Sequence, residues 1–327
     1  MKEAREFLFE KYSKNLEEIL NLNPLIKRPP YSIYMCPLCR LIFSENSLDQ
    51  SIKNPLTLEH VPPESVGGKE FVLTCKNCNN THGSKFDSHL DEKLRVKKVF
   101  TSKQGTLNSK VKFTIGEDIK SNGIIYLDES GKFNFMLEEK RTNPKYHKDI
   151  IEIVSGNMGN VKLKFSLNSY NEIKSNISIL RSAYLKTFKE LGYAFMLNSN
   201  NEEIRKRIVE NPVSHSPVKG VFMTTENNFV QGLSIITNPQ TLQGYLVGLK
   251  IIKDGVEELY NVLLPGGNFR SRTLYEEFEK MKTSNSADLS SFQITLLDGE
   301  DFITGKNKLL ALEYWGENFV FQKGEEK

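Results

Sequence analysis

The alternation of apolar and polar residues along the chain predicts an α+β protein. Residues 2–22 place apolar side chains at steps of four, which is the period of one helix face. The same period returns at 175–196, and a shorter helix with acidic residues in its first turn is predicted at 201–210. Short runs with the two-residue period of strands dominate 108–170 and 218–327. We therefore expect helical and strand-rich stretches that follow one another.

Prolines mark the predicted breaks between these stretches. Asn23-Pro24 and Pro29-Pro30 end the first helix, and residues 211–217, with two prolines, are typical of a linker. The predicted strands lie at 111–115, 123–127, 132–137, 160–165, 220–224, 245–252, 258–264, 292–297 and 308–315, with one helix at 273–282. The predicted regions are 1–30, an N-terminal amphipathic helix; 31–95, which contains every cysteine; 96–215, a mixed β and then helical region; and 216–327, a C-terminal β-rich α+β region.

Composition is that of a globular protein, with 38% hydrophobic and 26% charged residues in a chain of 327. No apolar run approaches the roughly 20 residues that span a bilayer, and the first residues lack the apolar core of a signal peptide. We therefore expect a cytoplasmic protein without a membrane partner.

A net charge of +3 does not by itself indicate a nucleic-acid partner. Residues 75–100 are locally basic, with six Lys and Arg against three Asp and Glu. Such a patch can meet phosphates, although a solvated helix face explains any single lysine equally well. The candidate phosphate contacts are Lys76, Lys85, Lys93 and Arg95.

The four cysteines of the chain form two pairs of identical spacing. Cys36 and Cys39 make the first C-x-x-C, and Cys75 and Cys78 make the second. Four thiolates at about 2.3 Å from a tetrahedral Zn²⁺ are the usual structural use of such pairs. Four free buried thiols and redox-active pairs are the alternatives. We expect a structural zinc with a closed coordination sphere, which leaves chemistry to other residues.

The residues between and after the pairs predict two strands and a helix. Residues 54–60 form a short strand that ends in Glu59 and His60, and two prolines then turn the chain. A second strand at 70–74 follows a glycine pair. A helix opens at Cys78 or Asn79 and places Asn79 and His82 on one face.

The stretch from Cys36 to Asp87 resembles the HNH endonuclease family with its ββα-metal fold. The matching elements are Glu-His-x-x-Pro-x-x-x-Gly-Gly at 59–68, Cys-x-x-Cys-Asn-Asn at 75–80 and Gly-x-x-x-Asp at 83–87. They follow one another in order over about a sixth of the chain, which makes the resemblance far more specific than a lone C-x-x-C. It implies that region 31–95 is a zinc-stapled nuclease domain.

The resemblance also implies a role for each matching position. His60 is expected to be the general base that takes a proton from the attacking water, which suits an ordinary histidine pKa of about 6.5. Glu59, Asn79 and His82 are expected to bind a catalytic Mg²⁺ or Mn²⁺, since oxygen ligands suit a hard cation. Asp87 and Asn80 are weaker candidates.

Two features depart from the family pattern. The asparagine that often lies midway between the histidine and the helix has no clear counterpart between Gly68 and Cys75. His82 occupies a variable position of the resembling branch. Each residue also has a structural reading: Glu59 and His60 as a surface pair, and Asn79 as a helix cap.

These observations predict a metal-dependent endonuclease that hydrolyses phosphodiester bonds in DNA, with a role in bacterial defence or a mobile element by family analogy alone. The alternative is a zinc-stapled nucleic-acid-binding or assembly module without hydrolytic activity. RNA as the substrate is a third reading that the chemistry does not exclude. A partner protein or a second copy of the chain is the expected source of regulation.

Overall fold

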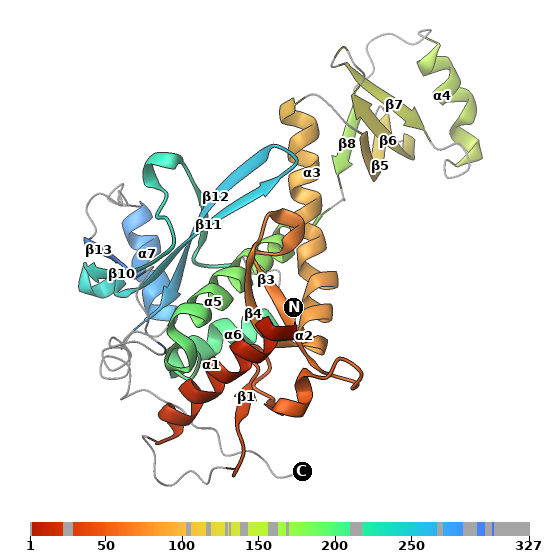
Figure 1. Cartoon of the computed structure of the whole chain (residues 1–327). Coiled ribbons are helices and arrows are strands. Elements are labelled where there is room, and N and C mark those ends of the chain that lie inside the picture. The colour runs from red at the N-terminus through yellow and green to blue at the C-terminus, as the bar shows by residue number, and fades with distance from the viewer. Residues whose placement is uncertain are drawn as a thin grey trace. The chain divides into compact units, whose positions relative to one another are not determined.

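A computed structural model describes most of the chain. The described residues are 2–21, 29–102, 106–115, 119–127, 130, 132–137, 143–155, 163–167, 170–209, 218–266, 271–283, 293–297 and 303. The predicted linker at 211–217 and the predicted strand at 308–315 lie outside them. Helices and strands are mixed in the described part, so the α+β class is confirmed (Figure 1).

The chain divides into two compact units. Unit 1 comprises Met1–Asp87, Asn176–Ile252 and Glu257–Lys327, and unit 2 comprises Ser88–Ser175 with Lys253–Val256. The four regions predicted from sequence follow the chain, whereas the units gather segments that are distant in sequence. Those four regions therefore stay a prediction about sequence organisation.

The predicted N-terminal helix is confirmed as α1, Lys2–Asn21. Its buried face includes Tyr12 and Leu16, which follow the predicted steps of four residues. Asn15 is buried as well, so the buried face is wider than those steps predict. The Tyr12 ring stacks on Phe188 at 4.9 Å, and its hydroxyl donates to the carbonyl of Lys189 over 2.8 Å. The helix is thereby fixed to α5.

Two small antiparallel hairpins form the motif region. β1 (Ile33–Met35) pairs with β2 (Ile42–Ser44), and β3 (Leu56–Val61) pairs with β4 (Glu70–Cys75). Helix α2 (Lys76–His82) follows β4 directly, as the sequence predicts for a strand, strand and helix. Two residues past β3, the structure turns back through a 3₁₀ segment, Glu64–Val66, that ends at Gly67 with a φ of 92°, a value that favours glycine.

Helix α5, Glu172–Met196, supplies the centre of unit 1 from residue 176 onward. Nearly every side chain from 175 to 198 is buried, including polar ones, so this helix is covered on all sides. Gly192 interrupts it with a φ of 61°, and a Cβ there would lie 2.3 Å from Asn15 Oδ1. Beyond this break, Phe195 meets Tyr245 of the sheet at 5.7 Å. The short helix α6, Glu202–Val209, confirms the helix predicted at 201–210.

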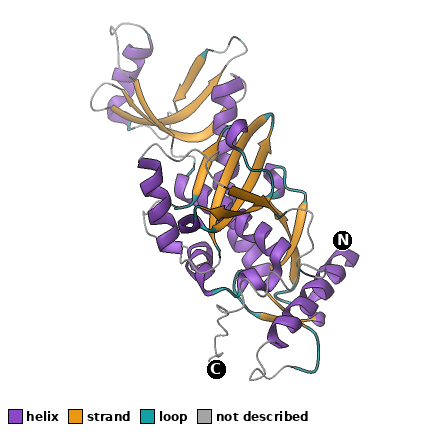
Figure 2. Cartoon of the chain, turned by 90° about the vertical axis from the view of Figure 1, so that its left-hand side faces the viewer, coloured by secondary structure: helices purple, strands orange, loops and turns teal. Residues whose placement is uncertain are grey.

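A five-stranded sheet completes unit 1 in the order β13-β10-β11-β12-β9, and Figure 2 shows its strands in orange. The strands are β9 (Val221–Thr224), β10 (Leu233–Asn238), β11 (Gly244–Lys253), β12 (Val256–Pro265) and β13 (Gln293–Leu296). Helix α7, Ser271–Thr283, packs on it through the stacked rings of Phe222 and Phe278, 5.2 Å apart. All but β10 match predicted strands.

Unit 2 is built from a four-stranded antiparallel sheet and two helices. The sheet has the order β7-β6-β5-β8, with strands at Thr106–Ile115 (β5), Ile119–Leu127 (β6), Phe133–Leu137 (β7) and Leu163–Leu167 (β8). Helix α3, Ser88–Ser102, holds most of the locally basic residues of 75–100, whereas α4, His147–Val154, lacks a counterpart in the prediction. No helix of the described residues is long and apolar enough to cross a membrane.

Candidate functional site

The four cysteines gather into one cluster, as predicted. Cys36 and Cys39 lie on the turn between β1 and β2, Cys75 ends β4 and Cys78 lies in the first turn of α2. Their sulfur atoms all lie within 4.8 Å of one another, and the Cys39 and Cys75 sulfurs are 3.7 Å apart. Four thiolates around a tetrahedral zinc lie about 3.8 Å apart. The spacing therefore fits a metal ion such as zinc.

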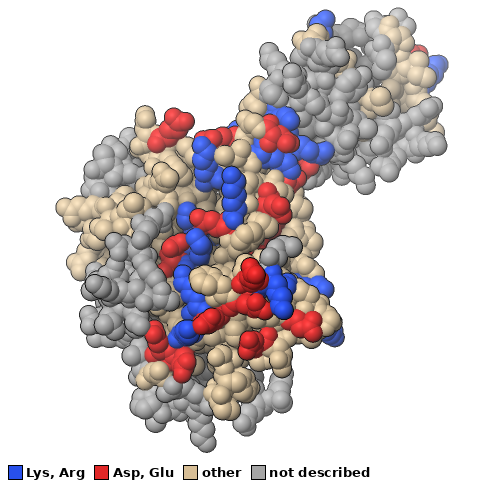
Figure 3. Space-filling model, viewed as in Figure 1, with Lys and Arg blue, Asp and Glu red and all other residues tan. Residues whose placement is uncertain are grey.

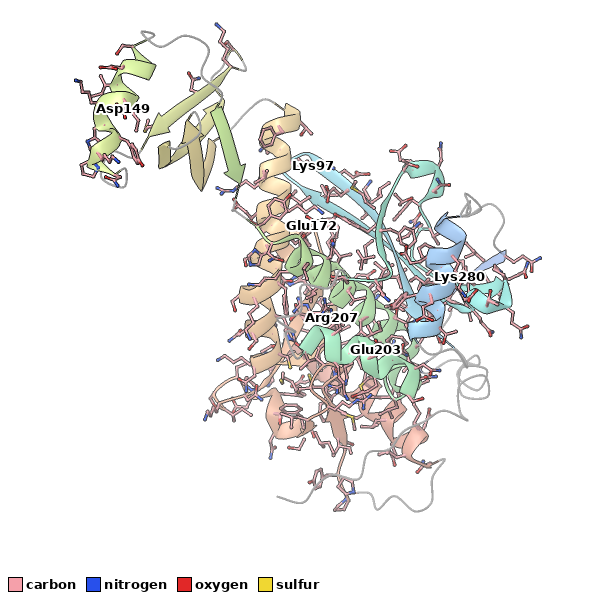
Figure 4. All side chains as sticks on the ribbon, turned by 180° about the vertical axis from the view of Figure 1, so that it is seen from behind. Lys97, Asp149, Glu172, Glu203, Arg207 and Lys280 are labelled. Carbon is pink, nitrogen blue, oxygen red and sulfur yellow. The ribbon has the colours of Figure 1, made fainter. Side chains whose placement is uncertain are left out.

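The turn that carries the first cysteine pair is held by a hydrogen bond within the turn and by hydrogen bonds from two helices. The Arg40 N–H donates to the Cys36 carbonyl over 2.9 Å, and Arg40 has a φ of 61°, which folds the backbone back beneath the sulfurs. Tyr184 of α5 and Arg205 of α6 donate to carbonyls of this turn at 3.3 and 2.7 Å. Figure 4 shows α6 from behind, with its Glu203 and Arg207 labelled. The cysteine cluster is thus tied to the helical core of unit 1.

The four thiols of the cluster differ in acidity because they hydrogen-bond to one another and are buried to different degrees. Hydrogen bonds from the Cys36, Cys39 and Cys78 thiols lower the pKa of Cys75. Burial raises the pKa of Cys36. A metal that binds all four sulfurs must displace the remaining protons, so metal affinity rises with pH.

Glu59 and His60, adjacent in sequence, leave β3 on opposite faces. Successive side chains of a strand alternate, and the antiparallel register pairs Glu59 with the buried Val72 and His60 with the half-buried Phe71. The exposed fraction of the side chain is 5% for Glu59 and 28% for His60. Of the two side chains, only that of Glu59 lies on the buried side of the hairpin.

Glu59 is held in a cluster of buried charges. The Arg181 Nη2 of α5 donates to Glu59 Oε1 and to Asp87 Oδ2, each over 2.8 Å. Ser178 donates to the second Asp87 oxygen over 2.6 Å. Burial raises the pKa of Glu59 to about 7, although Arg181 acts to lower it. We call Glu59, Asp87 and Arg181 the charged cluster.

Asp87 reaches this cluster because the helix after α2 changes its winding. Residues Gly83–Asp87 form a π-helical turn between α2 and α3. Such a turn inserts one residue per helical repeat and rotates the side chains that follow it, a feature frequent at functional sites. Both Phe86 and Asp87 are buried as a result.

Asn79 fastens α2 to β3. Its side-chain nitrogen donates to the Thr57 hydroxyl and to the Leu58 carbonyl, both over 3.1 Å. Helix α2 begins at Lys76 after the N-cap residue Cys75, so Asn79 lies inside the helix and does not cap it. It lies on the same face of β3 as Glu59, since Thr57 and Glu59 are two residues apart.

His82 and His60 have different surroundings. His82 is 2% exposed, stacks on Phe86 at 5.7 Å, and finds no hydrogen-bond partner for Nδ1 among the described residues. Burial lowers its pKa to about 3, assisted by the charges of Arg181 and Lys85. The His60 ring lies 4.5 Å from Phe71, and its Nδ1 lies 3.9 Å from a Glu64 oxygen. That distance suits an ion pair but is too long for a hydrogen bond.

The expected set of Glu59, Asn79 and His82 does not fit a divalent ion as arranged. A guanidinium already lies against the Glu59 carboxylate, at the position where a cation would bind. His82 packs its ring on Phe86. Among the described residues, the cysteine cluster alone brings three or more His, Cys, Asp or Glu side chains within 4.8 Å.

The four basic candidates for phosphate contact differ in their surroundings. Lys76 and Lys85 are exposed in unit 1. In unit 2, Lys93 pairs with Glu172 at 2.8 Å, and Arg95 pairs with Glu92 at 2.7 Å. In the view of Figure 3, basic and acidic side chains intermingle on the surface of unit 1. Their contact with a nucleic acid stays a prediction.

Arg181 was not among the residues predicted from the sequence, although a charged residue among apolar neighbours is visible there. Arg181 lies between Leu180 and Tyr184, in a helix whose side chains are buried on nearly every side. A charged residue in such a helix needs a buried partner. Its partners Glu59 and Asp87 are 122 and 94 residues away, a pairing that spacing alone does not reveal.

Comparison of the chain with models of known families, with curated proteins and with solved structures found no match. The HNH resemblance therefore rests on the motif residues alone.

Proposed function

We propose that the chain is a zinc-stapled ββα endonuclease that hydrolyses phosphodiester bonds in DNA. The observation that carries the proposal is the cysteine cluster at the base of β3, β4 and α2, with Glu59-His60 near the end of β3 and Asn79 in α2. This is the order of elements that the motif resemblance predicts. A structural zinc would hold the two hairpins and the helix together, while the chemistry falls to other side chains.

His60 is the proposed general base. Its side chain is partly exposed, so water and a phosphodiester can reach it, and its ring is supported by Phe71. We assign the acceptance of the proton from water to Nε2, because Nδ1 faces the Glu64 carboxylate at 3.9 Å.

A Mg²⁺ or Mn²⁺ ion, when bound, would supply positive charge against the phosphate. Glu59, the expected ligand of that ion, is bound to Arg181 in the structure. The proton transfer at His60 is the part of the chemistry that these residues support directly.

The second candidate function is a zinc-stapled binding or assembly module without hydrolysis. The observation that favours it is the buried ion pair of Glu59 with Arg181, which uses the proposed metal ligand for internal structure. The two candidates differ in one measurable property, which is cleavage that depends on His60.

The test is cleavage of supercoiled plasmid by zinc-loaded protein, with millimolar Mg²⁺ or Mn²⁺ and without added divalent ion. We expect metal-dependent nicking or cutting by the parent and a loss of at least about 100-fold in His60→Ala, the usual contribution of a general base. His89→Ala in unit 2 is the matched control and should cut like the parent.

Zinc content and circular dichroism establish that each protein is folded. Equal cleavage by the parent and His60→Ala would refute the role of His60. A folded, zinc-loaded parent that cleaves neither plasmid nor single-stranded RNA would favour the binding module.

A further inference from the structure

A cavity of about 520 Å³ opens beside the end of β3. Its wall includes Val61 and Pro62, which directly follow His60 in the chain. Consecutive Cα atoms lie about 3.8 Å apart, so the wall comes within about 8 Å of the His60 backbone. The volume is in the range of pockets that take small ligands, roughly 300–1,000 Å³. A molecule bound at His60 can therefore extend into this cavity.

The cavity is formed by three parts of unit 1 that contact one another. The β3–β4 hairpin, helix α5 and the strands β11 and β12 all contribute to its wall. A Cβ at Gly67 of the hairpin would lie 3.1 Å from the Ile252 carbonyl oxygen of β11. The segment 229–232 completes the wall and is tied to β11, because the Gly248 N–H donates to the Gly232 carbonyl over 2.7 Å. The cavity therefore belongs to the packed fold of unit 1 rather than to a single loop.

Among the described residues, lysines and glutamates line the cavity in equal number, three of each. Lys250 pairs with Glu257 at 2.7 Å. Glu70 pairs with Lys189 of α5 at 3.2 Å. These pairs use one lining lysine and two lining glutamates. The charges left over on the wall are those of Lys69, Lys186 and Glu226.

The unpaired charges of the wall favour an anion. Lys186 is half-buried on α5 and Lys69 is exposed on the hairpin, and neither has a carboxylate partner among the described residues. Together with Glu226 they carry a net charge of +1. An ammonium group that is partly removed from water gains free energy when an anion lies near it. Two such groups from different walls are suited to a phosphate group.

Phe229 adds an aromatic surface to the same cavity. Its side chain is half-exposed, and no other ring of the described residues contacts it. The ring lies over Gly248 of β11, where a Cβ would come within 3.0 Å of the Phe229 Cε2. A ring that is exposed in this way can stack on a nucleobase. Cations for a phosphate and a ring for a base thus meet in one cavity.

We infer that this cavity binds one nucleotide of the DNA strand whose phosphodiester lies at His60, with the phosphate at Lys69 and Lys186 and the base on Phe229. The inference deepens the proposed function and rests on it for the identity of the ligand. None of the four basic candidates from residues 75–100 lines this cavity. A base must be unpaired to stack on a side chain, so the strand bound here is single.

The experiment measures the binding of a fluorescein-labelled single-stranded DNA of about ten nucleotides to zinc-loaded protein by fluorescence anisotropy, without added Mg²⁺ or Mn²⁺. At about 100 mM salt, Lys186→Gln and Lys69→Gln should each bind about fivefold more weakly than the parent. Each should also lower the slope of log affinity against log salt by about 0.7, the contribution of one phosphate on a single strand. Phe229→Leu stays apolar and should weaken binding about fivefold without changing that slope.

Three further variants test the direction and the location of these effects. Glu226→Gln removes the unpaired carboxylate and should bind roughly twofold more tightly than the parent. Lys186→Arg keeps the charge and should bind within about twofold of the parent. Lys219→Gln changes an exposed lysine of unit 1 outside the cavity, and it is the matched control that should keep the affinity and the salt slope of the parent.

Zinc content and thermal unfolding establish that each variant is folded. Folded Lys186→Gln and Lys69→Gln that keep the affinity and the salt slope of the parent would overturn the inference. Equal weakening by Lys219→Gln would also overturn it, because the attraction would then be spread over the surface of unit 1. A parent that does not bind the single strand would do the same.

Cleavage measured on the same proteins separates this inference from the proposed function. Binding with the expected pattern of variants, but without His60-dependent cleavage, would support the cavity and favour the binding module. His60-dependent cleavage with unchanged affinity in the Lys69, Lys186 and Phe229 variants would refute the cavity and support the nuclease.

Discussion

The cysteine cluster and the charged cluster lie in the same unit and share the β3–β4 hairpin, yet they are assembled in different ways. The cysteines come from two short motifs, and each pair is positioned by a local turn or helix start. The charged cluster takes one residue from a strand, one from a π-helical turn and one from α5. The first is a set of like donors suited to a metal cation, and the second pairs two carboxylates with a guanidinium.

This difference teaches how far local patterns can predict a site. Equal spacing of four identical residues is visible in the sequence, because the ligands of a structural zinc come in close pairs. A buried ion pair between residues about a hundred positions apart has no spacing signature. Its sign in the sequence is an arginine between the apolar residues Leu180 and Tyr184, which indicates that a partner exists but does not name it.

The largest effect should come from breaking the cysteine cluster. Cys75→Ser is expected to lose zinc and destabilise unit 1 by several kcal/mol, because metal-binding free energy is folding free energy for such sites. Zinc content by mass spectrometry and urea unfolding measure the change. Ser84→Ala, on the exposed side of the π-helical turn, is the control. A Cys75→Ser protein that keeps one zinc and the parent stability would rule out a four-cysteine structural site.

A smaller effect should follow from breaking the charged cluster. Arg181→Met leaves two buried carboxylates without their cationic partner and should cost about 3–5 kcal/mol in unfolding free energy. Replacing the whole cluster, with Glu59→Leu and Asp87→Asn added, should recover most of this loss, since well-packed neutral residues avoid the desolvation of charges. Urea unfolding of the zinc-loaded proteins measures both changes in unfolding free energy. A triple variant less stable than Arg181→Met would show that the charges contribute net stability.

The smallest effect concerns acid sensitivity. Because burial lowers the pKa of His82 from 6.5 to about 3, the unfolded chain takes up the proton first. The stability that neutral His82 contributes is present above pH 6.5 and is lost as the pH falls toward 3, by up to about 1.4 kcal/mol per pH unit. His82→Gln should flatten the pH dependence of the unfolding free energy between pH 6.5 and 5.

That comparison needs zinc-loaded protein at every pH, with zinc content measured beside each unfolding curve. His147→Gln, in unit 2, is the control and should follow the parent. Parallel curves for His82→Gln and the parent would mean that His82 is not held neutral in the folded protein.

Much of the fold could be predicted from the sequence, because hydrophobic periodicity is strong in long segments. Helices α1, α5 and α6, and most strands of both sheets, lie where the pattern places them. The three-residue strands β1 and β2 are too short for a period to show, and the π-helical turn has no pattern of its own. The pattern of α5 also runs through Gly192 without showing the break there.

The candidate site was predictable only in part. The cysteine cluster is where its spacing indicates, and Asn79 lies against β3. The opposite directions of Glu59 and His60 follow from strand alternation, which the motif does not display. The roles of both residues stay predictions.

The distance along the chain between Asp87 and Arg181 also sets an order of events during synthesis. All four cysteines have been made by residue 78, so zinc can join the two hairpins while most of unit 1 is still to be translated. Arg181 follows Asp87 by 94 residues, and at 5–20 residues per second this interval lasts roughly 5–20 seconds. Throughout it, Glu59 and Asp87 have no arginine to meet. The ion pairs of the charged cluster can therefore form only after α5 has been made.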